Sequence, residues 1–486
     1  MPYKEALKKA AQAFEVYKKT TPAQRAQLLR TIAEEIEALG DVLLETASRE
    51  SNLPLARLTG ERGRTCSQLR LFADVVEEGS WVEATIDTAL PDRQPMPRPD
   101  MRRMLVPLGP VVVFGASNFP LAFSTAGGDT ASALAAGCTI VYKEHPGHPQ
   151  TSQLVNGAIA NALQRCKLPE GVFQHVSGGV EVGQEMVKHP ATKAVAFTGS
   201  YKGGKAIFDL AMQREVPVPV YAEMGSTNPL FILPEKLKED TQQLAKQAAA
   251  SVLLGSGQFC TCPGLLFVPE SDATHGFMEA LEEELSKATP ANMLHEGIAG
   301  NYYKGLDKLL KEQGVQAIIQ QETDVLEGRA ALASTNVQQW LQNPALQEEI
   351  FGPFTLVVTY KNADELLAAA NALQGQLTCT LWGTDKEQQL QQNLTDALRD
   401  KCGRLLFAGV PTGVEVSYAM THGGPFPATT DSRSTSVGVY AIKRFARPVT
   451  FQSAPQALLP QELQNENSTG IWRTINGKLT QSSINE

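Results

Sequence analysis

The sequence predicts a two-lobed α/β protein whose parallel sheets are covered by helices on both faces. From about residue 108 the chain repeats an apolar, largely β-branched run, a short loop and a helical stretch. The runs at 111–117, 138–145 and 193–200 are continuous, which is typical of strands buried on both faces. Two of these runs end in Gly or Ser before a helix begins, and such strand ends bind phosphate groups in parallel sheets.

The first ninety residues are predicted to be helical. Thr21 and Pro22 provide a cap and a first-turn proline before a stretch in which apolar residues recur at helical spacing over 28–39. A second helical stretch follows at about 55–79. The segment 91–103 then contains four prolines, which predicts a connector or a protruding arm.

A second α/β unit is predicted from residue 229 onward. It contains a helix over 240–257 and strand-like runs near 264–270, 354–360, 378–383 and 404–410. The tail from about residue 434 contains one more strand-like run, over 437–452, and such a strand needs a partner, which another subunit can supply.

The composition excludes several classes of protein. Against 52 Asp and Glu there are 43 Lys and Arg, so the net charge of −9 leaves no broad basic surface for nucleic acid or an anionic membrane. The seven cysteines show no pairing rhythm, which argues against a secreted disulfide framework. The charged start contains no apolar signal region, and no apolar run approaches the ~18 residues of a membrane span. A cytoplasmic globular protein with no nucleic-acid or membrane partner is expected.

Cys260 is the first candidate for chemistry, because it lies between glycines in a turn that follows a helix. A turn exposes the sulfur, and backbone N–H groups beside it can stabilise a developing oxyanion. An inert cysteine is the alternative, and the spacing of Cys260 and Cys262 also admits a redox pair or half of a metal site. No second cysteine pair completes a zinc site, and we interpret His145 and His148 as part of a surface loop, so no metal is expected.

Other polar side chains follow predicted strands. Glu223 ends one strand at the open edge of a parallel sheet, where functional residues gather, although a solvated carboxylate is the alternative. Asn118 follows the first strand, where its amide can donate to an oxyanion or simply belong to a turn. Glu349 and Phe351 share one extended segment, in which a carboxylate can bind ribose hydroxyls and an aromatic ring can pack on a flat one. An ordinary strand entry explains that pair equally well.

Taken together and in chain order, these motifs resemble the aldehyde dehydrogenase superfamily over nearly the whole chain. The motifs are SNFP at 117–120, VYKEHP at 141–146, FTGS at 197–200, EMG at 223–225, GQFC at 257–260 and EEIFGP at 348–353. Longer runs, among them PVYAEMGSTNP, GVPTGVEV and HGGPFPATTDSRSTSVG, are similar to the α-ketoglutaric semialdehyde (2,5-dioxovalerate) dehydrogenases. A long-chain fatty aldehyde dehydrogenase of luminous bacteria has related motifs. Two positions depart from the pattern: Cys262 replaces a usual Asn of the subfamily, and Ser117 replaces a Trp of the superfamily.

The resemblance implies an aldehyde dehydrogenase-like fold with a Rossmann-type cofactor-binding domain at 1–88 and 108–228. It implies an α/β catalytic domain at 229–433, with 89–107 and 434–486 as an oligomerisation arm and C-terminal segment. The exposed strand of the tail then predicts a homodimer or homotetramer.

The resemblance also assigns catalytic roles. Cys260 would attack the aldehyde carbon as a thiolate, and the Asn118 amide with the Cys260 backbone N–H would hold the oxyanion. One such donor is typically worth ~3 kcal/mol. Glu223 would activate the water that releases the acid, and we expect burial to raise the pKa of Glu223 and so suit it to general-base work.

For the cofactor, the resemblance implies that Lys143 contacts the adenosine ribose. Gly199 and Ser200 would lie near the pyrophosphate, and Glu349 and Phe351 would lie at the nicotinamide ribose.

The choice between NAD and NADP depends on one further position. Superfamily members that prefer NAD commonly carry a Glu three residues beyond the lysine, where this chain has Pro146. The missing carboxylate removes a repulsion, and Lys143 and Lys202 can pair with a 2′-phosphate. NADP is therefore expected to be accepted and preferred, with NAD possible.

The substrate candidates lie on two segments. Arg64 and Gln68 are one helical turn apart and are expected to face a dicarboxylate-like semialdehyde, with a surface helix as the alternative. Phe119, Phe123 and Leu254 are expected to line the aldehyde tunnel, and their apolar surface also suits an aliphatic aldehyde.

The favoured reaction is the oxidation of 2,5-dioxopentanoate to 2-oxoglutarate. The alternatives are oxidation of medium or long aliphatic aldehydes, a catalytically retired binding protein on the same fold, and a redox sensor. Joint retention of Asn118, Glu223 and Cys260 argues against retirement. In the redox sensor, a disulfide between Cys260 and Cys262 would form a strained ring.

Overall fold

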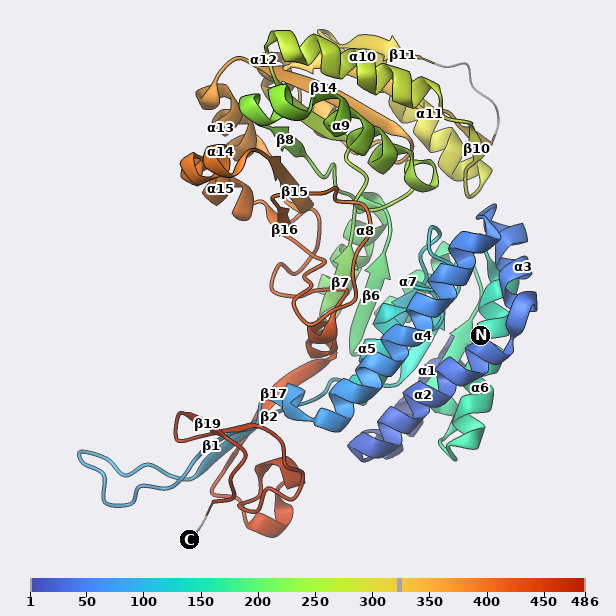
Figure 1. The fold of residues 1–486 in the computed structure, drawn as a ribbon. Helices are drawn as coiled ribbons and strands as arrows, with labels where there is room; N and C mark the ends of the chain where they lie inside the picture. The colour runs from blue at the N-terminus through green and yellow to red at the C-terminus, as the bar shows by residue number, and fades with distance from the viewer. Residues whose placement is uncertain (1, 321–325, 485–486) are drawn as a thin grey trace.

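The computed structural model describes residues 2–320 and 326–484, which form two α/β lobes and an extended arm (Figure 1). Each lobe contains a largely parallel sheet, and the arm carries a further sheet. The predicted α/β class is confirmed. No helix among the described residues is long and apolar enough to cross a membrane.

The N-terminal helices pack against the first lobe. The Thr21 side chain accepts a hydrogen bond from the Gln24 backbone, and the Gln24 side chain accepts one from the Thr21 backbone, so a capping box starts the second helix. The predicted single stretch after Pro22 is interrupted at Leu39, which caps the C-terminus of that helix. The helices are α1 Pro2–Tyr17, α2 Pro22–Ala38, α3 Gly40–Ser51 and α4 Leu55–Glu78.

The sheet of the first lobe is parallel and has the order β5-β4-β3-β6-β7. Because the strand order reverses between β3 and β6, the crevice at their carboxyl ends is the place where such sheets bind ligands. The elements are β3 Val111–Phe114, α5 Gly128–Ala136, β4 Ile140–Lys143, α6 Pro149–Arg165, β5 Phe173–Val176, α7 Val180–Lys188, β6 Ala194–Thr198, α8 Tyr201–Met212 and β7 Val220–Glu223.

The sheet of the second lobe has the order β11-β13-β14-β9-β8-β15-β16 and is parallel except for β11. Phe231 and Phe267 stack at 4.5 Å on one face, while Leu230 and Leu266 belong to the core on the other face, as expected for strands buried on both sides. The elements are β8 Leu230–Ile232, α9 Pro234–Leu253, β9 Leu265–Pro269, α10 Asp272–Ser286, α11 Glu296–Leu310, β11 Gln316–Ile319, β13 Ala331–Asn336, α12 Val337–Gln342, β14 Phe354–Tyr360, α13 Ala363–Ala372, β15 Gln376–Trp382, α14 Asp385–Leu390, α15 Gln392–Arg399 and β16 Cys402–Leu406, with β10 Ala291–Asn292 and β12 Glu327–Gly328 paired separately.

The arm contains a sheet of order β17-β2-β1-β18-β19, and the proline-rich segment between β1 and β2 protrudes from it (Figure 1). The predicted strand over 437–452 is only partly correct, because 439–445 forms a 3₁₀ helix. Arg444 of that helix makes a largely buried ion pair with Asp129 at 2.7 Å, which ties this segment to α5 instead of to the sheet. The strands are β1 Thr85–Asp87, β2 Met101–Pro107, β17 Ala446–Gln452, β18 Arg473–Ile475 and β19 Lys478–Thr480.

A long loop, residues 407–438, runs from β16 of the second lobe back to the first lobe, and we call it the crossing loop (Figure 1). It pairs with the end of β7: the Met224 N–H donates to Ala428 O at 2.8 Å and the Thr430 N–H donates to Ala222 O at 3.1 Å. These bonds place the middle of the crossing loop beside Glu223.

Candidate active site

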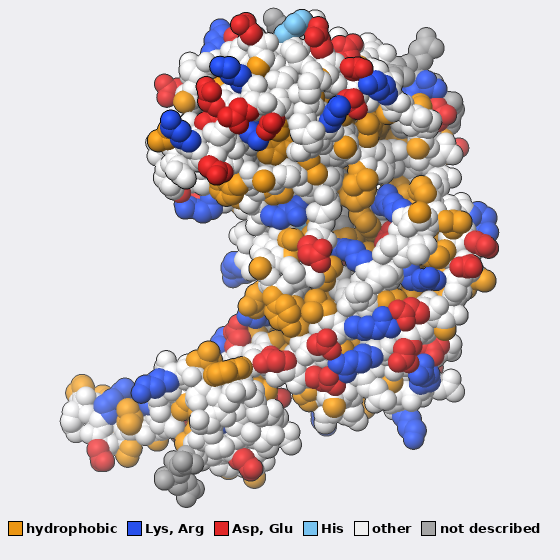
Figure 2. All heavy atoms as spheres, in the orientation of Figure 1, with side chains coloured by type: hydrophobic (Ala, Val, Ile, Leu, Met, Phe, Trp, Pro, Cys, Tyr) orange, Lys and Arg blue, Asp and Glu red, His pale blue; other side chains and the backbone are white. Residues whose placement is uncertain are grey.

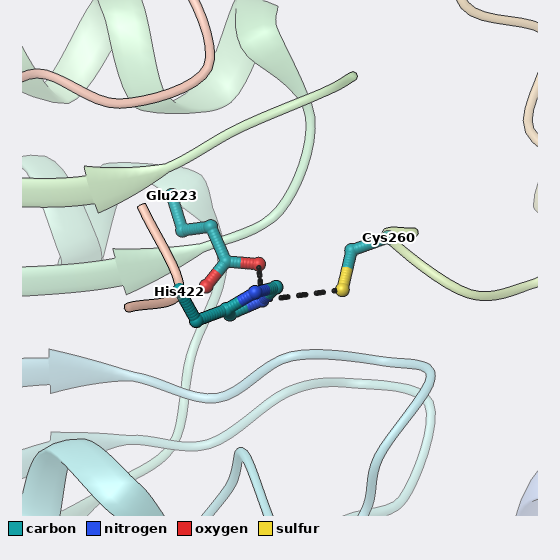
Figure 3. Close-up of side chains that lie close together, drawn as sticks. All are labelled: Glu223, Cys260 and His422. Atoms are coloured by element: carbon teal, nitrogen blue, oxygen red, sulfur yellow. Dashed lines mark hydrogen bonds and ion pairs between the residues drawn. The ribbon is translucent and has the colours of Figure 1, made fainter. Parts of the chain in front are cut away.

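Side chains from three distant segments meet between the lobes, and we call Glu223, His422 and Cys260 the Glu–His–Cys cluster (Figure 3). Glu223 ends β7, Cys260 lies in the turn after α9, and His422 lies on the crossing loop. His422 Nε2 is 2.9 Å from Glu223 Oε1 and 3.5 Å from Cys260 Sγ. Glu223 and His422 are only 3% and 1% exposed, whereas Cys260 is partly accessible.

Hydrogen bonds from the crossing loop fix the cluster. Ser436 Oγ donates to Glu223 Oε2 at 2.6 Å, and the backbone N–H of His422 donates to Thr435 Oγ1 at 2.8 Å. Because an ionised carboxylate only accepts hydrogen bonds, a proton on Nε2 of His422 is donated to Glu223 Oε1, with the Cys260 sulfur 3.5 Å from the same nitrogen.

The cluster shifts the pKa values of its acid and its thiol in opposite directions. Burial alone would raise the pKa of Glu223, but His422 and the hydrogen bonds from His422, Ser436 and Cys260 lower it below its usual value. The expectation of a raised Glu223 pKa was therefore wrong, because it considered burial without the donors that the fold supplies. Burial, followed by the Glu223 and Glu349 carboxylates, raises the pKa of the Cys260 thiol well above its usual value. The thiol consequently needs a base before it can act as a nucleophile.

Asn118 approaches the turn of Cys260 from the loop after β3. It is 9% exposed, and its Nδ2 donates to the backbone oxygen of Gln258 at 3.2 Å. Gln258 is itself fixed, because its Oε1 accepts from the Leu294 N–H at 2.9 Å. The structure thus brings together all three residues of the predicted catalytic set, Asn118, Glu223 and Cys260.

The Cys262 side chain lies against the end of α9. Its Sγ lies 3.8 Å from Val252 O, and burial, followed by Glu349, raises its pKa to about 12. The amide of Asn228 holds the turn between the two cysteines by donating to Cys260 O at 2.8 Å and Cys262 O at 3.0 Å. All seven cysteines, Cys260 and Cys262 among them, are free thiols in the structure.

Arg64 and Gln68 lie on α4 as predicted, but their surroundings differ. The Arg64 guanidinium lies 5.2 Å from the centre of the Phe123 ring and donates to Val414 O at 3.4 Å on the crossing loop. Gln68 is only 3% exposed, and its Nε2 lies against Gly128, where an added Cβ would be 2.6 Å away. Arg64 is therefore near the cluster, whereas Gln68 is packed under the start of α5.

Aromatic rings gather around the cluster. Phe119 packs edge-to-face on Phe123 at 5.2 Å and on Phe259 at 5.3 Å, and Phe123 lies 6.4 Å from the His422 ring. Leu254 begins the short turn before Cys260 and is 47% exposed. Apolar side chains are visible where the two lobes meet (Figure 2).

The cofactor candidates from the first lobe lie at the carboxyl edge of its sheet. Lys143 ends β4, is 7% exposed, and donates from Nζ to Glu144 O at 2.8 Å. Ser200 caps the N-terminus of α8, with Gly199 before it and the exposed Lys202 in the first turn. The first N–H groups of a helix have no partner within the helix, so this end can receive a phosphate.

Glu349 and Phe351 approach the site from the second lobe. The Glu349 carboxylate lies directly against Gly225, which follows β7: a Cβ on Gly225 would lie 2.3 Å from Glu349 Oε2, so a larger residue there would displace this carboxylate. Phe351 and Cys262 help to line one small cavity beside this segment. The exposed Glu349 side chain and the half-buried Phe351 are therefore accessible to a ligand between the lobes.

The surface-loop interpretation of His145 and His148 was wrong. His148 is 1% exposed, its Nε2 lies 2.8 Å from Ala116 O, and its ring stacks on His145 at 5.4 Å. His145 also faces His295 of the second lobe at 6.3 Å. The His145–His148 segment therefore packs inward, with His148 against the first lobe and His145 facing the second lobe.

His422 was not predicted from the sequence as a site residue. This residue lies in the HGGPFPATT run, which contributed to the resemblance but received no role. A single histidine in a Gly- and Pro-rich loop, without another catalytic or ligand residue at a characteristic spacing, carries no signal of function in the sequence. The place of His422 beside Glu223 becomes visible only in the fold, where the bridge between Glu223 and Thr429 and the hydrogen bonds around it bring the crossing loop to β7.

The site combines a thiol, a carboxylate that can accept its proton, and amide donors next to the thiol. This combination suits nucleophilic attack on a carbonyl carbon. The model of the aldehyde dehydrogenase family matches residues 2–397. The chain belongs to this family.

Two relatives of this aldehyde dehydrogenase family member are similar over nearly the full length. The chain is 47% identical over 481 residues to the alpha-ketoglutaric semialdehyde dehydrogenase of Acinetobacter baylyi, and the match covers 98% of this chain and 91% of the relative. It is 48% identical over 473 residues to alpha-ketoglutaric semialdehyde dehydrogenase 2 of Azospirillum brasilense, covering 96% and 90%.

Solved structures show the same fold. The glyceraldehyde-3-phosphate dehydrogenase GapN of Methanocaldococcus jannaschii, complexed with NADP, superposes with a TM-score of 0.77 at 21% identity and covers 93% of both chains. Apo betaine aldehyde dehydrogenase of Staphylococcus aureus superposes with a TM-score of 0.79 at 20% identity, covering 94% of this chain and 89% of that one.

Proposed function

We propose that this member of the aldehyde dehydrogenase family oxidises α-ketoglutaric semialdehyde (2,5-dioxopentanoate) to 2-oxoglutarate with NAD(P)⁺. The observation that carries the proposal is the Glu–His–Cys cluster with Asn118 beside it. The substrate is supported by the two relatives at 47% and 48% identity, which are both named alpha-ketoglutaric semialdehyde dehydrogenases.

In the first step Cys260 forms a bond from Sγ to the aldehyde carbon. The thiol proton passes to the Glu223 carboxylate, because Glu223 is the ionised group that the thiol reaches. The Nε2–H of His422, 3.5 Å from Sγ, stabilises negative charge on the sulfur as the proton leaves.

The carbonyl oxygen becomes an oxyanion in this step. The Asn118 amide and the backbone N–H of Cys260 would donate to it, and donors that the fold already holds in place cost little reorganisation. Bound NAD(P)⁺ would supply the hydride acceptor. When the former aldehyde carbon loses its hydrogen as hydride, the oxyanion returns to a carbonyl and a thioester remains on Cys260.

The last step is hydrolysis of the thioester. After Glu223 has lost its proton to solvent, its carboxylate takes a proton from a water molecule, and that water attacks the thioester carbon. The carbon–sulfur bond breaks, 2-oxoglutarate leaves, and the Cys260 thiol is restored.

The residues at the edge of the first sheet fit a dinucleotide. Gly199 and Ser200 would hold the pyrophosphate at the start of α8, Lys143 the adenosine ribose, and Glu349 and Phe351 the nicotinamide ribose. The fit is supported by the exposed apolar side chains of Val180 and Tyr201, 78% and 46% exposed, which start the two neighbouring helices α7 and α8.

We further propose that NADP is preferred over NAD, because Pro146 offers no carboxylate against a 2′-phosphate and Lys143, at the end of β4, and Lys202, in the first turn of α8, are cations that would pair with this phosphate. Burial lowers the pKa of Lys143, whereas the nearby carboxylates of Glu144 and Glu181 raise it. Because these carboxylates would also repel a 2′-phosphate, we expect the preference to be modest. Lys143→Ala should lower kcat/KM for NADP more than for NAD. A wild-type enzyme with a strong NAD preference would contradict the proposal.

Arg64 is the cation that supports a carboxylate-bearing substrate, because it lies beside Phe123 near the cluster. The aromatic group of Phe119, Phe123 and Phe259 favours a second candidate, the oxidation of medium or long aliphatic aldehydes. The dependence of kcat/KM on chain length separates the two.

We also propose that the chain acts in the cytoplasm as a homodimer or homotetramer, with residues 89–107 and 434–486 as the oligomerisation element. In this proposal 1–88 and 108–228 bind the cofactor and 229–433 form the catalytic domain. Among the described residues β17 pairs with β2 alone and leaves one edge for a second subunit. Light scattering of the full chain tests the assembly.

The test of function is formation of reduced cofactor from 2,5-dioxopentanoate, compared with hexanal, for the wild type and for Cys260→Ser. Much faster turnover of the semialdehyde, lost in the variant, is expected. Equal or faster turnover of hexanal would move the protein to the aliphatic branch, and no turnover of either would support a binding protein on the same fold.

A further inference from the structure

One guanidinium connects the two loops that carry Asn118 and Cys260. Arg57, in the first turn of α4, donates from Nη2 to the backbone oxygen of Asn118 at 2.8 Å. Its guanidinium carbon lies 5.0 Å from the centre of the Phe119 ring and 4.8 Å from that of Phe259. Phe119 follows Asn118 and Phe259 precedes Cys260, so Arg57 touches the immediate neighbour of each residue.

The contact has a geometry that a planar cation satisfies. The Phe119 and Phe259 rings are nearly perpendicular, at 88°, and the flat guanidinium lies close to both. An ammonium group is a point charge without a planar face, so Lys cannot stack in this way and donate to the Asn118 carbonyl with the same geometry.

The turn before Cys260 is shaped around this side chain. Gly255 has a positive φ of +57°, and an added Cβ would lie 2.7 Å from Arg57 Nη1 and 2.8 Å from the Phe259 ring. Arg57 Nε and Nη1 are buried and have no hydrogen-bond partner among the described residues. The guanidinium is therefore held mainly by the two rings and the Asn118 carbonyl.

We propose that Arg57 is a positioning residue that sets the Asn118 amide relative to Cys260, so that both donors converge on the oxyanion. We call the link that Arg57 makes between the Asn118 loop and the Cys260 turn the Arg57 clamp. The importance of the clamp for aldehyde oxidation rests on the proposed function, whereas the clamp itself rests on the contacts of Arg57 alone. Misplacement of a reacting group by about 1 Å can cost on the order of 100-fold in rate.

The test compares Arg57→Ala and Arg57→Lys with the matched control Arg62→Ala. Arg62 lies on the same helix and also donates to a backbone carbonyl, that of Gly40 at 2.9 Å, away from the Glu–His–Cys cluster. We measure kcat, the KM values for 2,5-dioxopentanoate and for the cofactor, the melting temperature, and the rate at which iodoacetamide alkylates Cys260.

Both Arg57 variants should lose about 10- to 100-fold in kcat, with KM for the cofactor unchanged. Guanidinium ion at millimolar concentration should restore part of the activity of Arg57→Ala, because it can refill the place between the rings. Arg62→Ala should stay within about twofold of the wild type.

Wild-type kcat in folded Arg57→Ala would overturn the proposal, as would full activity of Arg57→Lys, because charge alone would then suffice. If the wild type oxidises no aldehyde, the proposed function fails. The alkylation rate of Cys260 then still tests whether Arg57 positions the turn that carries this cysteine. An altered rate in Arg57→Ala but not in Arg62→Ala supports the clamp, and equal rates refute it.

Discussion

Replacement of His422 by Ala tests the part of the site that the structure added to the sequence analysis. The change removes the Nε2–H that lies 2.9 Å from Glu223 Oε1 and 3.5 Å from Cys260 Sγ. It leaves Ser436 as a donor to the carboxylate. His422 is 1% exposed, so the melting temperature must be measured beside activity.

The expected shift follows from the lost hydrogen bond. A bond to a charged group contributes about 1.5–3 kcal/mol, and one pKa unit corresponds to ~1.4 kcal/mol, so the pKa of Glu223 should rise by about 1–2 units. Glu223 is active as the carboxylate, and in the wild type its pKa lies below the usual value. The acid limb of the kcat/KM profile should therefore move to higher pH by the same amount.

The assay is the pH dependence of kcat/KM for 2,5-dioxopentanoate, with His422→Gln and His275→Ala as companions. The amide introduced by His422→Gln would return one N–H donor, so this variant should recover part of the shift. The His275 side chain is 83% exposed on α10, and its replacement should change nothing. An acid limb of His422→Ala that stays at the wild-type pH would refute the role given to His422.

Three further predictions follow from the same site. Ser436→Ala removes the 2.6 Å hydrogen bond to Glu223 Oε2, so the pKa of Glu223 should rise and the acid limb of the kcat/KM profile should move to higher pH. The remaining bond from His422 should keep this pKa below that of a carboxylate that lacks both donors. An unmoved acid limb would show that Ser436 does not set the pKa. Arg64→Ala should raise KM for 2,5-dioxopentanoate by about tenfold and leave KM for hexanal nearly unchanged, because only the first substrate carries a carboxylate; equal changes for both would contradict the assignment. Added Zn²⁺ should bind the Glu–His–Cys cluster and inhibit the enzyme reversibly, because the potential ligand atoms of the three side chains lie within 4.8 Å of one another. Equilibrium dialysis should then find stoichiometric zinc on the wild type and none on Cys260→Ser, and retention of zinc by the variant would place the metal elsewhere.

The regular elements were largely predictable from local patterns. The continuous apolar runs at 111–114 and 354–360 became buried parallel strands, and Thr21 with Pro22 started a helix where expected. These predictions succeeded because burial on both faces and helix capping leave a signal within a few residues. The prediction of a strand over 437–452 was wrong in its first half, because Arg444 there pairs with Asp129, which is more than 300 positions away in the sequence.

The site was only partly predictable for the same reason. Cys260 and Glu223 stand out locally, at a turn and at a strand end. His422 acquires its role only when the crossing loop pairs with β7, and no spacing in the sequence reports that pairing. The lowered pKa of Glu223 likewise depends on donors from the crossing loop, which composition and local pattern do not reveal.

The most direct test of the account is to quench the wild-type enzyme with acid during turnover of 2,5-dioxopentanoate and map acylated peptides by mass spectrometry. The account predicts a 2-oxoglutaryl thioester on Cys260, absent from Cys260→Ser and still present on Cys260 in a Cys262→Ser variant. An adduct on Cys262, or turnover without any acylated Cys260, would contradict it.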